Sequence, residues 1–417
     1  MRNIFFIKDT VANKIAYYHL LAFLVFLPFD RLYSEIALVS FLVHTLIHLR
    51  KASFLSVKWS TVLLPASIYL LTCIGTLYTD YRGEAFSEWE RQLAILLFPL
   101  LFSLTSLDLD KYRLYLLKGL ALSCVLTIVY LYSNAIHVIQ YNHQSFRLLF
   151  TTAFLNHNFA EPVDMHATYF SMYIALSIAT FVYLLANTQT KRSRLLYIAG
   201  LVILLAGILQ LASRAVFIAL FININIIVPL FLLNGRKRFV FMAISLGISL
   251  VIIAGLLKSD VFKNRYVTEL KTDLTQQSIN LNILEPRVVR WGCAWELIRE
   301  SPVIGHGSGS EIALLKEKYY AKQYYNSYIN ELNAHDQFLS FLIKTGVPGL
   351  LVFLLVLWAG FAKAIRSKDM LFCSFLVIIT IVAFSENILD ANKGIFFFAF
   401  FFSLFYVVPS KKMRIVT

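Results

Sequence analysis

Long apolar runs recur along this chain, and they constrain its fold more than any other feature. Of its 417 residues, 59% are hydrophobic and only 15% are charged. An α-helix needs about 20 mostly apolar residues to cross the hydrocarbon core of a bilayer. Backbone groups in that core must be satisfied within the segment itself, so such runs are expected to be helical. We therefore predict an all-α, polytopic integral membrane protein with about twelve transmembrane helices.

The predicted helices form one integral membrane domain, residues 1–417, and are joined by short and long loops. The twelve spans are 12–29, 33–49, 60–78, 92–107, 114–136, 167–187, 195–212, 215–233, 238–257, 347–365, 370–386 and 394–409. A large loop, residues 258–335, separates the ninth span from the tenth. Functional groups concentrate in long loops that a rigid scaffold holds, so this loop is where we look for chemistry.

Lysine and arginine follow a consistent pattern in the short loops. Four clusters of positive charge fall on the same side of the membrane as the N-terminus. They are Arg50/Lys51/Lys58, Lys191/Arg192/Arg194, Arg236/Lys237/Arg238 and Lys363/Arg366/Lys368. Because cytoplasmic loops carry the excess of positive charge, both termini are predicted to be cytoplasmic and the 258–335 loop non-cytoplasmic. Topology and anionic lipid then account for most of the net charge of +14, so no nucleic-acid partner is expected. No cleavable signal peptide is evident, and the four cysteines do not imply a disulfide framework.

The large loop contains "EPRVVRWGCAWELIRESPVIGHGSGS", which predicts a helix starting near Pro286 or Arg287. Arg287 and Arg290 lie three residues apart, so they share one face of that helix and could hold one polyanionic group together. "GHGSG" lacks a following lysine and a preceding strand, so a flexible turn is a better interpretation than a phosphate loop.

The stretch "NAHDQFLSFLIKTGVPGLL", beginning at Asn333, places a histidine and an aspartate just before a long apolar run. We predict a short surface helix over 335–344 that "TGVPG" interrupts, with the membrane crossing starting near Pro348. Two interpretations of His335 stay open. A neutral histidine there could accept a proton, or His335 could simply help Asn333 and Asp336 to cap the helix.

Arg214 is a lone cation between two apolar arms, either a snorkelling side chain or a ligand-binding group. With Arg287, Arg290 and His335 it maps to one side of the membrane. Arginines bind phosphate in a bidentate manner, so this set fits a lipid diphosphate, and a nearby proton acceptor indicates transfer. Glu386 and Asp390 could orient an arginine or histidine, or be ordinary loop charges. Histidines such as His157 and His166 lack metal-site spacing, so neither a metal nor another cofactor is predicted.

The order "SRA", "R..RW..A.ELI.ESPVIGHGSG" and "NAHDQFLSFLIKTGVPGLL" resembles the O-antigen ligase and O-antigen polymerase superfamily. The resemblance covers the second half well, and the first half rests on helix number and on "DMHATYFSMYIALS". It implies a metal-independent, inverting glycosyltransferase of the bacterial inner membrane, with its active site on the periplasmic side. Its donor would be a glycan on undecaprenyl diphosphate, and the acceptor of a ligase would be a sugar hydroxyl of lipid A core.

Carried onto this sequence, the resemblance makes Arg214, Arg287 and Arg290 the diphosphate-binding residues. Arg287, Arg290 and His335 would be catalytic, with His335 activating the acceptor hydroxyl. Asp336, His166 and Glu386 are candidate supporting residues. Asp336 stands where many relatives have asparagine, and an adjacent carboxylate would favour a charged His335.

Three functions remain open from the sequence. The ligase is favoured, because the single large loop with its arginine pair follows the ligase pattern. A polysaccharide polymerase would use the same donor. A lipid-linked glycan flippase or other transporter would place polar sites near the bilayer midplane, whereas here they gather at one face. The tyrosine-rich part of the loop is interpreted as lying on the membrane surface.

Overall fold

The computed structural model describes residues 2–29, 31–275 and 285–408, and within these ranges the chain is helical without a strand. The prediction of an all-α protein is therefore confirmed. Every predicted span contains a helix. These helices are α2 (Val11–Phe26), α3 (Arg31–Ile47), α5 (Trp59–Gly75), α6 (Arg82–Leu104), α7 (Leu109–Tyr141), α9 (Ala167–Asn187), α10 (Lys191–Leu211), α11 (Arg214–Ile222) continued through η4 (Asn223–Ile227) into α12 (Val228–Leu232), α13 (Gly235–Leu256), α19 (Gln337–Ser367), α20 (Met370–Ala383) and α21 (Asn392–Tyr406).

Six helices in the described part of the chain are long and apolar enough to cross a membrane. They are α7, α9, α10, the continuous segment Arg214–Leu232, α13 and α19. Five shorter apolar helices, α2, α3, α5, α20 and α21, fall below that length. Helix α6 begins with a charged stretch and belongs to neither group. The chain is thus a membrane protein by composition, while the number of twelve crossings stays a prediction.

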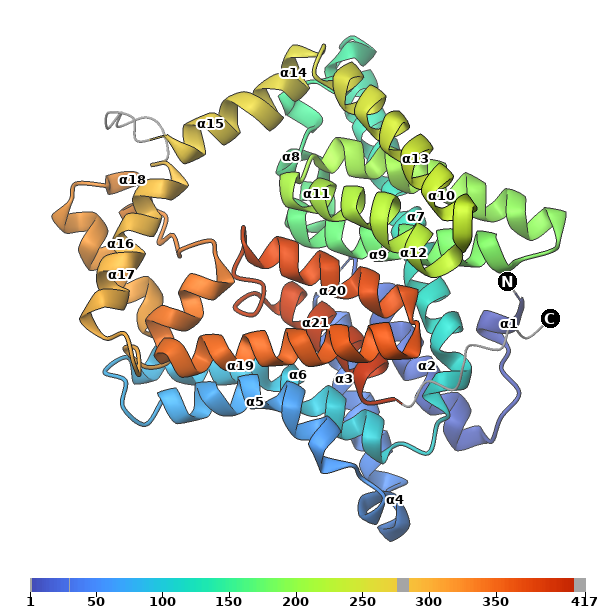
Figure 1. Cartoon of the computed structure of the whole chain (residues 1–417), viewed down its shortest axis with the longest axis horizontal. Coiled ribbons are helices and arrows are strands. Elements are labelled where there is room, and N and C mark those ends of the chain that lie inside the picture. The colour runs from blue at the N-terminus through green and yellow to red at the C-terminus, as the bar shows by residue number, and fades with distance from the viewer. Residues whose placement is uncertain (1, 30, 276–284, 409–417) are drawn as a thin grey trace.

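The two C-terminal helices lie in the core of the bundle. In α21 every residue from Gly394 to Phe405 is buried. Its Phe400 stacks on Phe23 of α2 and meets Phe98 of α6 edge-on. Helix α13 is the opposite case, because Ser245 is its one buried residue. Figure 1 shows α13 at the outer edge of the molecule, where it packs beside α12. An apolar helix exposed in this way is suited to lipid.

The large loop folds into short helices, which run in Figure 1 from the top of the molecule, where α14 lies, to the end opposite α1 (Arg2–Phe5), where α16, α17 and α18 lie. They are α14 (Asp260–Lys263), η5 (Asn264–Thr268), α15 (Glu269–Leu274), α16 (Arg287–Glu300), α17 (Ser310–Ala321) and α18 (Tyr325–Ile329). Residues 276–284 lie outside the described ranges. Leu297 and Leu315 of the loop pack with Leu339 and Ile343 of α19 in a small core of their own. The loop is therefore anchored on the first turns of α19.

The remaining short elements connect these helices. They are α4 (Lys51–Leu55), η1 (Phe146–Phe150), η2 (Thr152–Phe154), α8 (His157–Ala160) and η3 (Glu161–Val163).

Helix α19 breaks at Gly346, where φ is 63° and ψ is −156°. The interruption predicted at "TGVPG" is thus confirmed. The "GHGSG" turn packs into the break: His306 N donates to Ile343 O at 2.8 Å and Gly307 N donates to Lys344 O at 2.8 Å. Carbonyl groups that the kink would leave unpaired are satisfied in this way. The turn is therefore an integral part of the kink, where the sequence analysis expected flexibility.

Gly346→Ala is expected to destabilise the protein, because a positive φ disfavours a side chain and a Cβ would lie 2.2 Å from Val303 O. Gly247→Ala is the matched control, since a Cβ there meets no neighbouring atom and alanine favours the helix of α13. Thermal unfolding of the detergent-solubilised variants measures both. Equal melting temperatures for the two variants would show that the kink does not depend on glycine.

Candidate active site

His335 and Asp336 are adjacent in sequence but have different partners. The Asp336 carboxylate is the N-cap of α19 and accepts from the backbone N–H groups of Phe338 at 2.8 Å and Leu339 at 3.0 Å. Helix α19 therefore begins at Gln337, two residues later than predicted. His335 adopts φ 48°, and its Nδ1 lies 3.2 Å from Glu386 Oε2. Capping is thus the role of Asp336, and the imidazole of His335 is directed to another segment.

Glu386 follows α20 and uses its two oxygens on different partners. Oε2 contacts His335, and Oε1 lies 3.9 Å from Arg287 Nη2. Burial opposes ionisation of this carboxyl, but the hydrogen bond and charge of His335 and the charges of His166 and Arg287 hold its pKa below the usual value. Glu386 is thus an ionised carboxylate that contacts two of the three predicted catalytic residues, His335 and Arg287.

Arg214 and Arg287 come together through a residue that the sequence analysis missed. Asp273 of α15 binds Arg214 Nη2 at 2.5 Å, and the same oxygen lies 3.9 Å from Arg287 Nε. Arg287 Nη1 also donates to Ser385 O at 3.0 Å. Asp273 stands in "ELKTDL", a polar stretch without a motif, so no signal in the sequence pointed to it. Arg214 Nη1 is buried without a hydrogen-bond partner in the described structure.

Arg290 is oriented differently from Arg287, although both begin α16. Its side chain is only 4% exposed, and neither Nε nor Nη1 has a hydrogen-bond partner in the described structure. Burial lowers its pKa, and the charge of Arg287 adds to this effect, yet a guanidinium stays protonated in proteins. A buried cation with two unpaired donors is costly unless an anionic group supplies acceptors.

His166 lies before α9, next to the same carboxylate but without a hydrogen bond to His335. Its ring centroid is 4.2 Å from that of His157 and 5.1 Å from that of Tyr169. Burial lowers the pKa of His166 to about 4, and the opposing charge of Glu386 does not offset it. His166 is therefore a neutral wall residue near pH 7.

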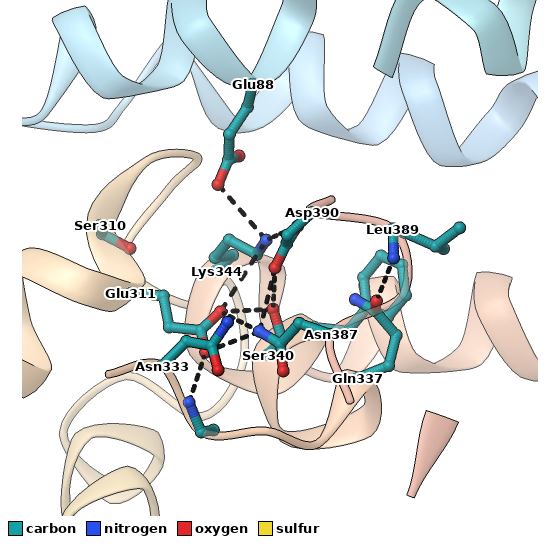
Figure 2. Close-up of polar contacts among 12 residues, drawn as sticks. Glu88, Ser310, Glu311, Asn333, Gln337, Ser340, Lys344, Asn387, Leu389 and Asp390 are labelled. Carbon is teal, nitrogen blue, oxygen red and sulfur yellow. Dashed lines mark hydrogen bonds and ion pairs between the residues drawn. The ribbon is translucent and has the colours of Figure 1, made fainter. Parts of the chain in front are cut away.

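Lys344 is the centre of a second polar cluster. Figure 2 shows its ammonium group between Glu88 of α6, Glu311 of α17 and Asp390. Lys344 Nζ lies 2.8 Å from Asp390, 3.3 Å from Glu88 and 3.9 Å from Glu311. The sequence placed Lys344 near the headgroups and did not predict these partners. Lys344 is 5% exposed, so burying its charge requires this neutralisation.

Hydrogen bonds connect the cluster around Lys344 to the turn that carries His335. Glu311 accepts from Ser340 Oγ at 2.5 Å, from Ala334 N at 3.0 Å and from Asn387 Nδ2 at 2.9 Å. Asn387 Oδ1 in turn accepts from Asp336 N at 2.9 Å. The segment that carries Glu386 and the turn that carries His335 are therefore held against each other by backbone and amide bonds, which fixes the His335–Glu386 pair.

A cavity of about 940 Å³ opens beside this constellation. Its wall includes His166, His335 and Glu386, together with residues of α6 and α17. Arg214, Arg287 and Arg290 do not line it. The predicted site residues thus divide into two sides. The arginines lie outside the cavity wall, His335 and Glu386 are part of it, and Glu386 connects the two groups through its contact with Arg287.

Lys344→Met is expected to destabilise the protein by about 3–5 kcal/mol, because it leaves buried carboxylates without their cation. Lys318→Met, which removes an exposed ion pair to Glu300, should cost less than about 1 kcal/mol. Denaturant midpoints of the two purified variants provide the comparison. A small effect of Lys344→Met would mean that the three carboxylates are protonated or hydrated and do not depend on the lysine.

Acidification should remove a stabilising contribution of His166. Its pKa of about 4 in the folded state lies below the usual value of about 6.5, so folding favours the neutral form. The contribution is complete above about pH 6.5 and decreases as the pH falls toward 4, by at most about 3 kcal/mol. In His166→Gln this part of the pH dependence of the melting temperature should be absent, whereas the exposed His137→Gln variant should retain it. The same acid response in both variants would contradict the assignment.

No group of three histidine, cysteine, aspartate or glutamate side chains that could hold a metal ion occurs among the residues that the structure describes. Metal-independent chemistry remains a prediction. The four cysteines are free.

Comparison with known proteins bears on the part of the chain that holds this constellation. No curated protein matches the chain. Residues 199–354 match the family model of the O-Antigen ligase, a stretch that includes Arg214, Arg287, Arg290 and His335. Members of this family are glycosyltransferase-like enzymes. The resemblance inferred from the sequence is thereby confirmed: residues 199–354 are similar to the O-antigen ligase family, and this match supports the O-antigen ligase superfamily.

Proposed function

We propose that the protein is an O-antigen ligase of the bacterial inner membrane. It transfers a glycan from undecaprenyl diphosphate to a sugar hydroxyl of lipid A core at the periplasmic face, with inversion and without a metal. The observation that carries this proposal is the chain of contacts from His335 through Glu386 to Arg287, with separations of 3.2 and 3.9 Å. It joins a proton acceptor to an anion-binding group beside a cavity.

The arginines account for the donor. A lipid diphosphate is an activated leaving group, so the protein must position it and stabilise the charge that develops on the departing phosphate. Among the residues that the structure describes, Arg290 has two buried donors without partners, and Arg214 has one. Arg287 has only long contacts of 3.9 Å to carboxylates, which a phosphate oxygen can replace. These unused donors are suited to a diphosphate.

His335 accounts for the acceptor. When Nδ1–H donates to Glu386, the neutral imidazole presents Nε2 as a proton acceptor. The acceptor oxygen attacks the anomeric carbon, its proton passes to Nε2, and the bond from that carbon to the diphosphate oxygen breaks. A single displacement of this kind inverts the anomeric configuration. The carboxylate that supports His335 is Glu386, because Asp336 is engaged by backbone N–H groups.

The decisive experiment is transfer of an undecaprenyl-diphosphate-linked glycan by the purified protein in EDTA, offered lipid A core or a second lipid-linked glycan. His335→Ala is expected to reduce transfer to core by about 10²–10⁴-fold, because the general base is lost. Arg287→Ala should reduce it by about 10²-fold or more, because a donor to the leaving group is lost. Arg299→Ala, an exposed arginine of the same helix, is the control and should retain full activity.

The outcomes separate the related functions. Chain extension without attachment to core would make the protein a polymerase that uses the same donor. Absence of transfer to either acceptor, or full activity of both variants, would overturn the proposed site. Movement of the lipid-linked glycan across proteoliposomes would then be the next measurement, as a test of transport.

A further inference from the structure

The wall of the 940 Å³ cavity is strongly acidic. Seven carboxylates line it, namely Glu84, Glu88, Glu311, Glu317, Glu331, Glu386 and Asp390, against two permanent cations, Arg91 and Lys316. Glu88, Glu311 and Glu386 are buried in its inner part, whereas Glu84, Glu317 and Glu331 are exposed in its outer part. The site as a whole is thus cationic where the arginines lie and anionic where the cavity lies.

The cations of the wall are largely neutralised by individual carboxylates. Lys316 binds Glu331 at 2.5 Å, and the charge of Arg91 acts on Asp390 and helps to hold its pKa low against the effect of burial. In the described part of the chain neither Glu84 nor Glu317 has a cation at ion-pair distance; Glu317 only accepts a 3.4 Å hydrogen bond from Tyr81. Negative charge therefore remains available at the outer wall.

Tyrosine rings contribute the apolar part of the same wall. Tyr320 and Tyr328 both line the cavity, with ring centroids 5.4 Å apart, and Tyr169 lines its inner part. The tyrosine-rich stretch was interpreted from the sequence as lying on the membrane, but these two side chains face the cavity. Aromatic rings combine an apolar face with a polar hydroxyl, and carboxylates accept hydrogen bonds from hydroxyl groups. The two together match a sugar ring, which has C–H faces and a hydroxyl edge.

The same wall disfavours anions. A phosphate or carboxylate that enters the cavity would face the unpaired carboxylates Glu84 and Glu317 of the exposed outer wall, and like charges repel. Selectivity achieved by repulsion is a common device of specific binding sites. The arginines, which lie outside the cavity wall, attract the anionic groups that the cavity repels. Charge alone would therefore direct the diphosphate and the acceptor to different parts of the site.

We propose that this cavity is the acceptor-sugar site, and that it accepts neutral or amino sugars while it rejects sugars that carry phosphate or carboxylate groups beside the accepting hydroxyl. The proposal rests on the transferase function proposed above and adds the chemical class of the acceptor. The sugar enters between the outer carboxylates and the tyrosines and presents its hydroxyl to His335.

Direct binding tests the proposal without relying on transfer. The full-length protein in nanodiscs is titrated with a neutral hexose oligosaccharide, its amino-sugar analogue and its phosphorylated analogue, and binding is followed by saturation-transfer NMR. The first two are expected to bind at least tenfold more tightly than the third. In the Glu84→Gln/Glu317→Gln double variant this ratio should fall by at least threefold, because two unpaired charges are removed. Glu90→Gln, exposed on α6 but outside the cavity wall, should leave the ratio unchanged.

Binding of undecaprenyl diphosphate to the double variant provides the second control, and it should equal that of the unaltered protein. Equal or tighter binding of the phosphorylated sugar, or no binding of any of the three, would overturn the proposal. Expected selectivity in binding without glycan transfer would leave the cavity's preference intact and reject the proposed function. Transfer onto neutral and phosphorylated acceptors alike would support the proposed transferase function and reject the cavity's selectivity.

Discussion

The ammonium group of Lys344 is the interaction on which the site depends. It gathers carboxylates from α6, from α17 and from the segment after α20, three stretches that are distant in the sequence. The kink at Gly346 sets the position of this lysine, and the "GHGSG" turn completes the backbone hydrogen bonds of the kink. Glu88, Glu311 and Asp390 also line the neighbouring cavity. One neutralisation requirement therefore joins the helices and determines the electrostatic character of the neighbouring pocket.

The constellation around His335 combines rigid and open parts. His335 and Glu386 are held by a network of satisfied hydrogen bonds through Asn387 and Glu311, so their separation does not depend on a substrate. The arginine side is different, because Arg214 and Arg290 keep buried donors without partners. A site that is complete around the proposed base and incomplete around the anion-binding groups is preorganised for chemistry, and it has unused hydrogen-bonding capacity for its ligand.

Much of this arrangement could be predicted from the sequence, for identifiable reasons. The length of the apolar runs predicted the helices. The motif "TGVPG" predicted the break in α19, because glycine and proline act through local backbone geometry. Arg214, Arg287, His335 and Glu386 were found by residue type and order. Asp273, Glu88 and Glu311 were not found, because their significance comes from partners on other helices, which no local pattern in the sequence indicates. Neighbourhood in sequence also misled: Asp336 next to His335 looked like its charge partner, yet an N-cap directs that carboxylate to the backbone of α19. Arg290 is three residues from Arg287 in the same helix, but it is buried and lies near Tyr319 of α17, which no periodicity reveals.

Glu386 divides its charge between two partners, and this couples the donor side of the proposed reaction to the acceptor side. While the donor is absent, one oxygen faces Arg287 and the other faces His335. A diphosphate that engages Arg287 withdraws that cation from the carboxylate, whose full charge then acts on the imidazole. The proposed donor site and the proposed base thereby share one carboxylate. By reciprocity, a protonated His335 draws on the same carboxylate and favours release of Arg287 to the leaving group. A single carboxylate in this position lets each substrate sense the presence of the other without any movement of the helices.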